Sequence, residues 1–250
     1  SLNVASQSWD TSNGATLTTG STTVASTVTV DPADLANGLL KVVDTAGTDT
    51  LATGSVTTGA YGLLDLTGIE TFDITDLDMT GTLTMNMRDV SGLTSLRITG
   101  STDGDLADDV TITSMPSGVT TYLTGDYGAD GKTFSVTAKT GSTTDTHVLS
   151  TDGGNLTNDD ALDAYTFNGF ETFTIQAGAD DINLAADAGG TAEDGLLTLG
   201  STTTLNIGGD IVNTSDDGDI TLGTVAATSL TSVALTTEGG SVTIADLGTT

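Results

Sequence analysis

The stretch GFETFTIQAGADDINLAAD, residues 169 to 187, contains two short runs in which every second residue is apolar, joined by a turn of Gly, Ala and Asp residues. Phe173 and Ile175 form the first apolar pair, and Ile182 and Leu184 form the second. Successive side chains of a β-strand point to opposite faces, so this spacing predicts two short strands that each bury one face. The residues between them favour a tight turn.

The same spacing recurs along most of the chain, and helical periodicity is almost absent. The sequence therefore predicts an all-β protein. Further apolar pairs of this kind are Val28 and Val30, Phe72 and Ile74, Leu83 and Met85, Leu96 and Ile98, Val110 and Ile112, Phe134 and Val136, Leu197 and Leu199, Leu205 and Ile207, Ile220 and Leu222, Val233 and Leu235, and Val242 and Ile244.

These strands recur at similar intervals, which indicates a repeat of about two dozen residues. Such a period predicts a parallel β-solenoid, in which each coil contributes two or three strands and stacks on the next coil. An antiparallel β-sandwich is the alternative, because its strands also recur with turns between them. The series are Phe72, Leu96 and Tyr122; Leu83, Val110 and Phe134; Ile182, Leu205 and Val233; and Leu197, Ile220 and Val242.

We expect three parts along the chain. Residues 1 to 38 form an N-terminal strand segment with a short capping helix, residues 39 to 145 form a first half of the solenoid, and residues 146 to 250 form a second half. The helix is predicted over residues 31 to 38, DPADLANG, with Asp31 as N-cap and a proline at the first helical position. The N-terminal segment is expected to dock on a neighbouring chain, to which it could donate a strand.

Two heptapeptides 101 residues apart, residues 68 to 74 and 169 to 175, share the form G-Φ-E-T-F-x-I, where Φ is apolar. The string GTDTL, residues 47 to 51, precedes the first copy. These strings and the composition around them resemble those of bacterial S-layer and RTX-type secreted proteins. The resemblance implies a calcium-dependent β-solenoid, export without disulfides, and lateral assembly on the cell exterior. The intact glycine-rich nonapeptide of that family does not occur, which favours individual calcium ions at corners over a regular ladder of ions.

Glu70 and Glu171 occupy the third position of the two heptapeptides. Each lies next to an apolar residue, which leaves two orientations open. In one, the carboxylate lies inward or at an edge, where it coordinates an ion or caps a turn. In the other, which we prefer, it points to solvent as one residue of a polar stripe.

Charge restricts the class of partner. The chain of 250 residues has 34 acidic and 5 basic residues, so its formal net charge is −29. Binding to nucleic acid needs a cationic patch that five scattered bases do not build, and an anionic membrane surface is excluded for the same reason. No apolar run is long enough to insert into a membrane. There is no cysteine, so disulfides and thiolate metal sites are also excluded.

A surface this acidic attracts divalent cations, and calcium prefers carboxylate and carbonyl oxygens in loose geometry. Acidic residues gather on glycine-containing turns between the predicted strands, where backbone carbonyls are also available. Solvated turns without a metal are the alternative, because Asp favours turn geometry by itself. The predicted calcium ligands are Asp103, Asp105, Asp108, Asp109, Asp126, Asp130, Asp180, Asp181, Asp216, Asp217 and Asp219.

Motifs for catalysis are scarce. The single histidine, His147, has no G-x-S-x-G sequence nearby, so we expect a strand or surface residue. No glycine-rich phosphate-binding loop ends in a lysine. Clustered carboxylates can hydrolyse polysaccharides, but Trp9 and five bases provide few further groups for holding a sugar. The sequence therefore predicts no enzymatic activity.

These observations predict an extracellular structural protein of a bacterial cell surface, whose copies assemble into a layer or filament with calcium bridging acidic surfaces. A cell-surface polysaccharide is a second candidate partner. The first residue is not Met and no signal peptide precedes the strands, so a mature or excised segment of a larger protein is expected. The alternative function is an adhesin or carbohydrate-binding module of a larger secreted protein. Thr-x-Thr units, such as residues 27 to 29, also leave an ice-binding face open.

Overall fold

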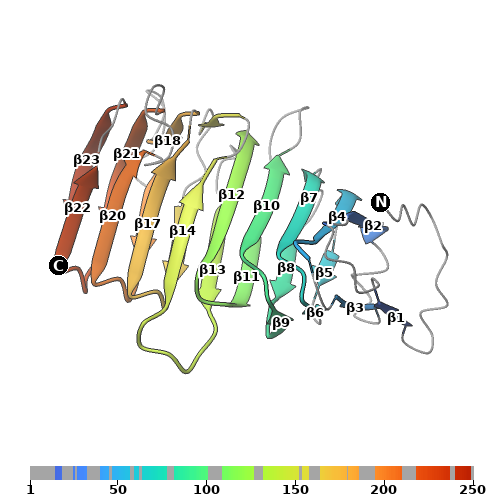
Figure 1. The fold of residues 1–250 in the computed structure, drawn as a ribbon. Helices are drawn as coiled ribbons and strands as arrows, with labels where there is room; N and C mark the ends of the chain where they lie inside the picture. Colours follow the sequence, from blue (N-terminus) through green and yellow to red (C-terminus); the bar gives the residue numbers. More distant parts are fainter. Residues whose placement is uncertain are drawn as a thin grey trace.

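The chain folds as a parallel β-solenoid with nearly no helix and coils of about 26 residues (Figure 1). Every strand pair in the described residues is parallel, which excludes the antiparallel sandwich and confirms the predicted fold class. The computed structural model describes residues 15–18, 25, 27–32, 40–44, 47–56, 59–61, 64–77, 82–100, 109–126, 132–151, 154–157, 164–178, 180–185, 195–209, 218–236 and 240–248.

One sheet, which we name the front sheet, runs along the whole rod and faces the viewer in Figure 1. The number of residues from one of its strands to the next varies, from 21 between Leu51 and Phe72 to 32 between Ile175 and Ile207. Its strands are β2 (Thr27–Val30), β4 (Thr50–Ser55), β7 (Thr71–Leu77), β10 (Ser95–Gly100), β12 (Val119–Asp126), β14 (Thr146–Ser150), β17 (Thr172–Ala177), β20 (Thr204–Gly209) and β22 (Ser232–Thr236).

A second row of strands, the back sheet, also extends along the rod. It ends in the last residues of β21 (Ile220–Ala226) and β23 (Val242–Gly248), which continue the pairing that begins at β5. The other strands of the back sheet are β5 (Gly59–Tyr61), β8 (Leu83–Asn86), β11 (Val110–Met115), β13 (Thr133–Ala138), β16 (Ala164–Asn168) and β19 (Leu196–Leu199).

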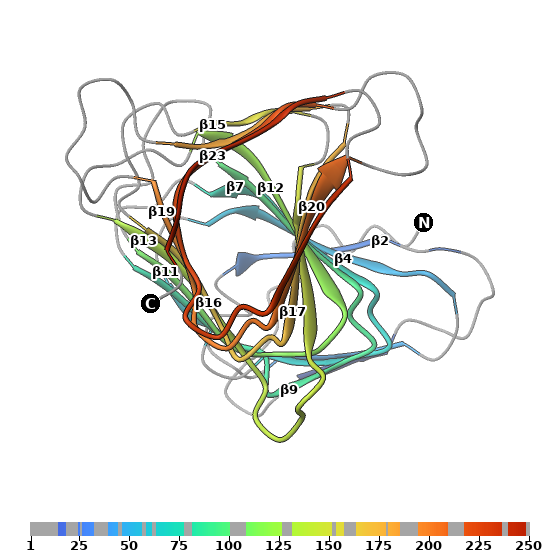
Figure 2. The same ribbon diagram turned by 90° about the vertical axis from the view of Figure 1, so that its left-hand side faces the viewer.

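A third row of strands lies on opposite sides of the rod in its two halves (Figure 2). In the first half, an N-terminal side sheet precedes the front strand of each coil: β1 (Ala15–Thr18), β3 (Leu40–Val43), β6 (Asp65–Thr67) and β9 (Asp89–Ser91). In the second half, a C-terminal side sheet follows the front strand instead: the end of β12, β15 (Leu156–Thr157), β18 (Ile182–Leu184) and the first residues of β21 and β23. The end-on view in Figure 2 shows the strands arranged around the axis of the rod, with β15 and β9 on opposite sides.

The core is one cluster of buried apolar side chains that extends from Val28 to Ala227. Residues alternate along each strand; in β10, for example, Leu96 and Ile98 are buried and Arg97 points outward. Burial of one Leu, Ile, Val or Phe side chain is worth about 1.5–3 kcal/mol, but a single coil cannot bury its own apolar side. Stacking therefore supplies the stability of the rod.

Several predicted registers are confirmed. Phe72 pairs with Leu96 in the front sheet, and Leu83, Val110 and Phe134 follow one another in the back sheet. The last two coils confirm the pairs of Leu205 with Val233 and of Ile220 with Val242.

Two predicted steps are wrong because they connect different sides of the rod. Ile182 pairs with Ile220 in the C-terminal side sheet, not with Leu205, which lies in the front sheet. Leu197 pairs with Val225 in the back sheet, not with Ile220. Counting residues gives the length of a coil but not which of its three sides a strand occupies.

A third predicted step is wrong by one residue. Leu96 pairs with Thr121, and Thr121 is fully buried in the core. Tyr122, which the series placed inward, lies on the outer face of the front sheet beside Arg97. The shift arises because the coil from β10 to β12 has 25 residues between Leu96 and Thr121, one fewer than the interval chosen from the sequence.

Within the N-terminal segment, β1 pairs with β3 and β2 pairs with β4, so both strands belong to the stack of coils. Val28 and Val30 of β2 are part of the core. Of the helix predicted over residues 31 to 38, residues 33 to 38 lie outside the described residues.

Candidate functional site

The first copy of the repeated heptapeptide forms a corner of the solenoid immediately before β7. Gly68 has a φ of 71°, a conformation in which glycine has no steric penalty, and Ile69 is buried. The carboxylate Oε2 of Glu70 accepts a hydrogen bond from the backbone N–H of Asp49, one coil earlier, at 2.7 Å. The backbone N–H of Thr71 donates to the carbonyl of the same Asp49 at 3.0 Å.

The second copy forms an equivalent corner immediately before β17. Gly169 has a φ of 82°, and Glu171 Oε2 accepts a hydrogen bond from the backbone N–H of Asp145 at 2.7 Å. The N–H of Thr172 donates to the Asp145 carbonyl at 3.1 Å. The preferred solvent-facing orientation of Glu70 and Glu171 is therefore wrong, since both carboxylates cap a turn of the preceding coil.

Asp49 and Asp145 share a sequence signal that the heptapeptides alone do not show. Each is a buried Asp followed by Thr at the start of a front strand, one coil before the glutamate. A D-T pair followed one coil later by G-Φ-E-T predicts, in both places, the hydrogen bond from the aspartate N–H to the glutamate carboxylate. The repeat is thus a two-coil corner motif, in which one coil supplies the amide and the next supplies the carboxylate.

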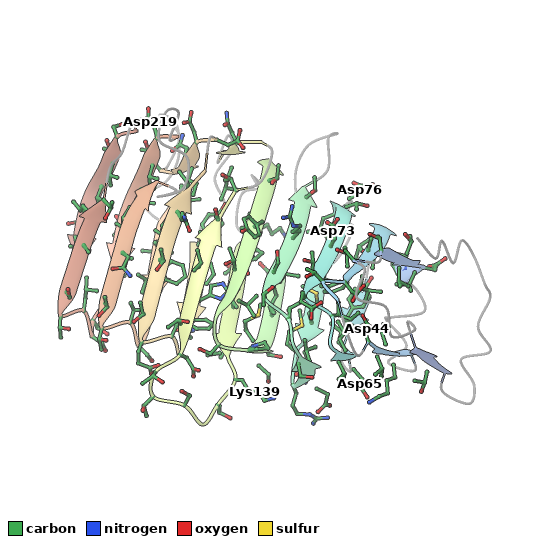
Figure 3. All side chains as sticks on the ribbon, viewed as in Figure 1. Asp44, Asp65, Asp73, Asp76, Lys139 and Asp219 are labelled. Carbon is green, nitrogen blue, oxygen red and sulfur yellow. The ribbon has the colours of Figure 1, made fainter. Side chains whose placement is uncertain are left out.

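Three of the predicted calcium ligands also bond to the backbone of the next coil. Asp181 Oδ1 accepts from the N–H of Asp219 at 2.7 Å, and Asp219 Oδ1 accepts from the N–H and the hydroxyl of Ser241 at 2.7 and 2.9 Å. Asn155 does the same for the N–H of Asp181 at 3.0 Å. Figure 3 shows Asp219 at the edge of these coils. In the back sheet, Asp109 Oδ1 accepts from the N–H of Thr133 at 2.8 Å.

Asp180 completes the set of predicted ligands whose side chains the structure describes. Its Oδ2 accepts a hydrogen bond from the N–H of Gly154, in the preceding coil, at 3.0 Å. The hydrogen bonds from Ser241 lower the pKa of Asp219 below its usual value. These aspartates therefore act as caps that join one coil to the next.

Not all of the predicted ligands can be placed. Asp126 ends β12, but its side chain is not described. In the ranges that the structure covers, no three acidic or histidine side chains form a group able to hold a metal ion. The positions outside the described residues are Asp103, Asp105, Asp108, Asp130, Asp216 and Asp217.

His147 was expected to be a strand or surface residue. It lies in strand β14 and is 0% exposed, so it is a strand residue but not a surface residue. Its ring lies 4.7, 5.5 and 6.0 Å from the ring centres of Phe170, Phe167 and Phe173. Neither ring nitrogen has a hydrogen-bond partner among the described residues. Burial lowers its pKa to about 3, so the imidazole is a neutral core side chain.

A polar hollow lies on the outer face of the front sheet, over β7, β10 and β12. Arg97 is the direct neighbour of Asp73 on one side and of Tyr122 on the other. The guanidinium carbon lies 5.0 Å from the centre of the Tyr122 ring, within the range of a cation–π contact. Figure 3 labels Asp73 on this face.

The hollow has a volume of about 160 Å³ and is further lined by the threonines of the same face, Thr75, Thr99 and Thr124. Burial raises the pKa of Asp73, and the positive charge of Arg97 partly opposes that effect. One carboxylate, one guanidinium, one phenol ring and several hydroxyls thus converge on one small concave surface.

The sequence did not reveal this group because its members lie 24 and 25 residues apart, at Asp73, Arg97 and Tyr122. They become neighbours only through the register of three strands. The sequence contains one clue to this group, which is the register of Tyr122. Once Thr121 is paired with Leu96 in the core, Tyr122 falls on the outer face beside Arg97, and Arg97 is itself beside Asp73.

Two other surfaces lack such a combination. A hollow of about 250 Å³ over β17, β20 and β22 is lined by no charged side chain. Its polar side chains, among them Thr174, Gln176 and Asn206, are all uncharged. The large apolar side chains that are exposed in the described structure, Val233, Leu235 and Leu247, lie in β22 and β23. The described part of the chain contains no helical segment with the length and hydropathy of a membrane span.

Comparison with protein-family models, curated proteins and solved structures found no match to this chain.

Proposed function

We propose that this chain is a rigid structural element of an extracellular bacterial surface layer or filament, in which copies associate and calcium bridges their acidic turns. The observation that carries the proposal is the unbroken stack of parallel coils around one core. In such a stack each coil contacts only its neighbours, so stability accumulates along the rod and the product is a stiff spacer. That property suits a mechanical role.

The bonding between coils supports this role. The corner glutamates and the turn aspartates tie several pairs of adjacent coils together through backbone amides, without any cysteine. A rod built in this way does not depend on disulfide formation outside the cell. In its lack of disulfides, the rod resembles the bacterial S-layer and RTX-type proteins to which the short motifs of the sequence are similar.

The charge distribution supports the calcium part of the proposal. Asp181 and Asp219 lie in adjacent coils, where strands are about 4.8 Å apart, and their negative charges repel each other. A calcium ion between two rods would use carboxylate oxygens and reduce the self-repulsion of a chain with net charge −29. Exposed Val233 and Leu235 would be covered by a parallel coil from a neighbouring copy.

The first test is assembly. We expect millimolar calcium to convert the purified chain into sheets or fibres visible by electron microscopy, and excess chelator to dissolve them. A chain that stays monomeric with and without calcium would contradict the proposal and favour the adhesin or carbohydrate-binding alternative.

A matched variant separates calcium binding from coil capping. Asn155 shows that an asparagine can accept the coil-linking hydrogen bond, so Asp181→Asn with Asp219→Asn removes charge and preserves the caps. We expect calcium to raise the melting temperature of the parent chain, because a ligand that binds only the folded state stabilises it. The double variant should lose much of that rise. An equal rise in both chains would show that these aspartates are caps alone.

A further inference from the structure

We propose that the hollow over β7, β10 and β12 is a binding site for a neutral saccharide, held by Asp73, Arg97 and Tyr122. The proposal goes beyond the structural role and does not depend on it, since a single rod could bind a glycan without assembling. It rests on the position, chemistry and charge of these three side chains and of the threonines around them.

Their position is set by the backbone, not by flexible loops. All three residues project from the centres of adjacent front strands, with Arg97 between Asp73 and Tyr122 in register. Neighbouring strands are about 4.8 Å apart, so the three groups form a short row along the rod axis. The contact between Arg97 and the Tyr122 ring restrains the guanidinium at that place. Residues on rigid strands can form a preorganised site.

The chemistry of the row matches hydroxyl groups. A sugar hydroxyl both donates and accepts hydrogen bonds, an ionised Asp73 only accepts, and Arg97 only donates. An acceptor next to a donor can therefore serve two neighbouring hydroxyls of one sugar ring, with the greater strength of charge-assisted hydrogen bonds. The hydroxyls of Thr75 and Thr99 line the same hollow; Thr75 donates its hydrogen to the carbonyl of Thr53 at 2.8 Å and offers the sugar an acceptor, whereas Thr99 can do either. The Tyr122 ring adds an apolar edge for the C–H groups of the sugar.

The size of the hollow indicates what part of a saccharide it takes. Pockets that enclose a whole small-molecule ligand measure about 300–1,000 Å³, whereas this hollow measures about 160 Å³. It would therefore hold one unit of a longer chain lying across the front sheet. The neighbouring units would remain on the surface.

Charge selects a neutral saccharide over an acidic one. The chain carries net charge −29, so a polyuronate or a phosphorylated glycan is repelled at long range. Within the hollow, Asp73 competes with any ligand carboxylate for Arg97. A neutral glycan meets neither obstacle.

The test is affinity electrophoresis of the full chain in native gels that contain starch, laminarin, mannan or xylan, with polygalacturonate and alginate as acidic probes. We expect at least one neutral polysaccharide to retard the protein and neither acidic polymer to do so. Arg97→Ala and Asp73→Asn should each weaken the apparent affinity about tenfold or more, the usual effect of losing a hydrogen bond to a charged group.

The matched control is Arg88→Ala. Arg88 is also an arginine next to an aspartate, Asp89 at 2.8 Å, but it lies at the N-terminal side sheet, away from the hollow. This variant should be retarded as strongly as the parent chain. Arg97→Lys keeps the charge but lacks the planar fork, so it should lose most of the binding while retaining the fold, which circular dichroism can verify.

Three results would overturn the proposal. One is that none of the four neutral polysaccharides retards the parent chain. Another is that only the acidic polymers do. The third is that folded Arg97→Lys and Asp73→Asn are retarded as strongly as the parent chain, which would place any saccharide binding elsewhere on the rod.

Discussion

The corner before β7 is hydrogen-bonded to the start of β4, and the corner before β17 is hydrogen-bonded to the start of β14. The two corners have the same hydrogen bonds but different cores. In both, a glutamate caps the backbone N–H of a buried aspartate at 2.7 Å. In the first corner Leu51 is the register partner of Phe72, and in the second His147 is the register partner of Phe173. The position that holds a leucine in one corner holds an uncharged imidazole in the other.

This difference shows that the corner is specified by its backbone hydrogen bonds more than by the residue type of the adjacent core position. A buried polar group without a partner is unfavourable, and the second corner compensates by surrounding His147 with aromatic rings. Phe167 and Phe173, whose ring centres are 4.5 Å apart, belong to the same aromatic group. The first corner has no such requirement.

The two corners also meet different neighbours. Before β7 the chain passes through the N-terminal side sheet, and Gly68 lies against the carbonyl of Asp44 in the preceding coil. Before β17 the chain comes directly from the back sheet, and Gly169 lies against the side chain of Ala138. One motif therefore serves two cross-sections of the rod.

Replacing the corner glycines should produce the largest difference. We expect Gly68→Ala to lower the free energy of unfolding by about 2–5 kcal/mol, because the left-handed conformation disfavours a side chain and the new Cβ would collide with a backbone carbonyl. Gly169→Ala should cost only about 1–2 kcal/mol, because its Cβ would meet the Ala138 methyl at 3.1 Å, which can shift. Urea denaturation of both variants measures the two values. Equal losses would show that the side sheet does not constrain the first corner.

Removal of the capping carboxylates should have an intermediate and similar effect in the two corners. Glu70→Ala and Glu171→Ala each leave the N–H of a buried aspartate without its acceptor, which we expect to cost about 1–3 kcal/mol. Glu70→Gln and Glu171→Gln retain an acceptor oxygen and serve as controls that should lose less. A loss confined to one corner would contradict the equivalence of the two motifs.

The last effect should appear only in acid and only at the second corner. The pKa of His147 is lowered to about 3, whereas an exposed histidine in the unfolded chain titrates near pH 6.5. The unfolded state therefore binds a proton first as the pH falls, and the stability that the neutral imidazole allows above about pH 6.5 is lost progressively until about pH 3. At pH 5 this loss amounts to about 2 kcal/mol.

The comparison of the parent chain with His147→Leu, which copies Leu51, isolates this contribution from the titration of the many carboxylates. We expect the stability advantage of the variant to be about 2 kcal/mol greater at pH 5 than at pH 8. Chemical denaturation at the two pH values measures it. An advantage that does not change with pH would mean that His147 takes up its proton in the folded chain as readily as in the unfolded one.

The repeat was readable from the sequence where consecutive coils differ little in length. Leu83, Val110 and Phe134 illustrate this, since each follows the previous one in the back sheet. The prediction failed at Ile182, because the coil from Ile175 to Ile207 has 32 residues and apolar pairs on different sides look alike. Periodicity reports that a residue is buried, not which neighbour covers it.

The candidate sites show the same limit. Asp109, Asp181 and Asp219 lie immediately before β11, β18 and β21, and their hydrogen bonds to the next coil depend on backbone amides that sequence spacing does not locate. The row of Asp73, Arg97 and Tyr122 was missed because a shift of one residue moves a side chain from the core to the surface.

By itself, the sequence determined that this protein is acidic and consists of short strands that recur about every two dozen residues, because alternation, glycine-rich turns and a repeat are local properties of the chain. The parallel pairing of these strands, which the sequence left open against an antiparallel sandwich, was decided by the tertiary structure. Only the tertiary structure decided the register between coils, and with it the capping of Asp49 by Glu70 and the meeting of Arg97 with Tyr122. Register depends on the summed packing and hydrogen bonding of whole coils, whose lengths vary, and no single segment contains that information.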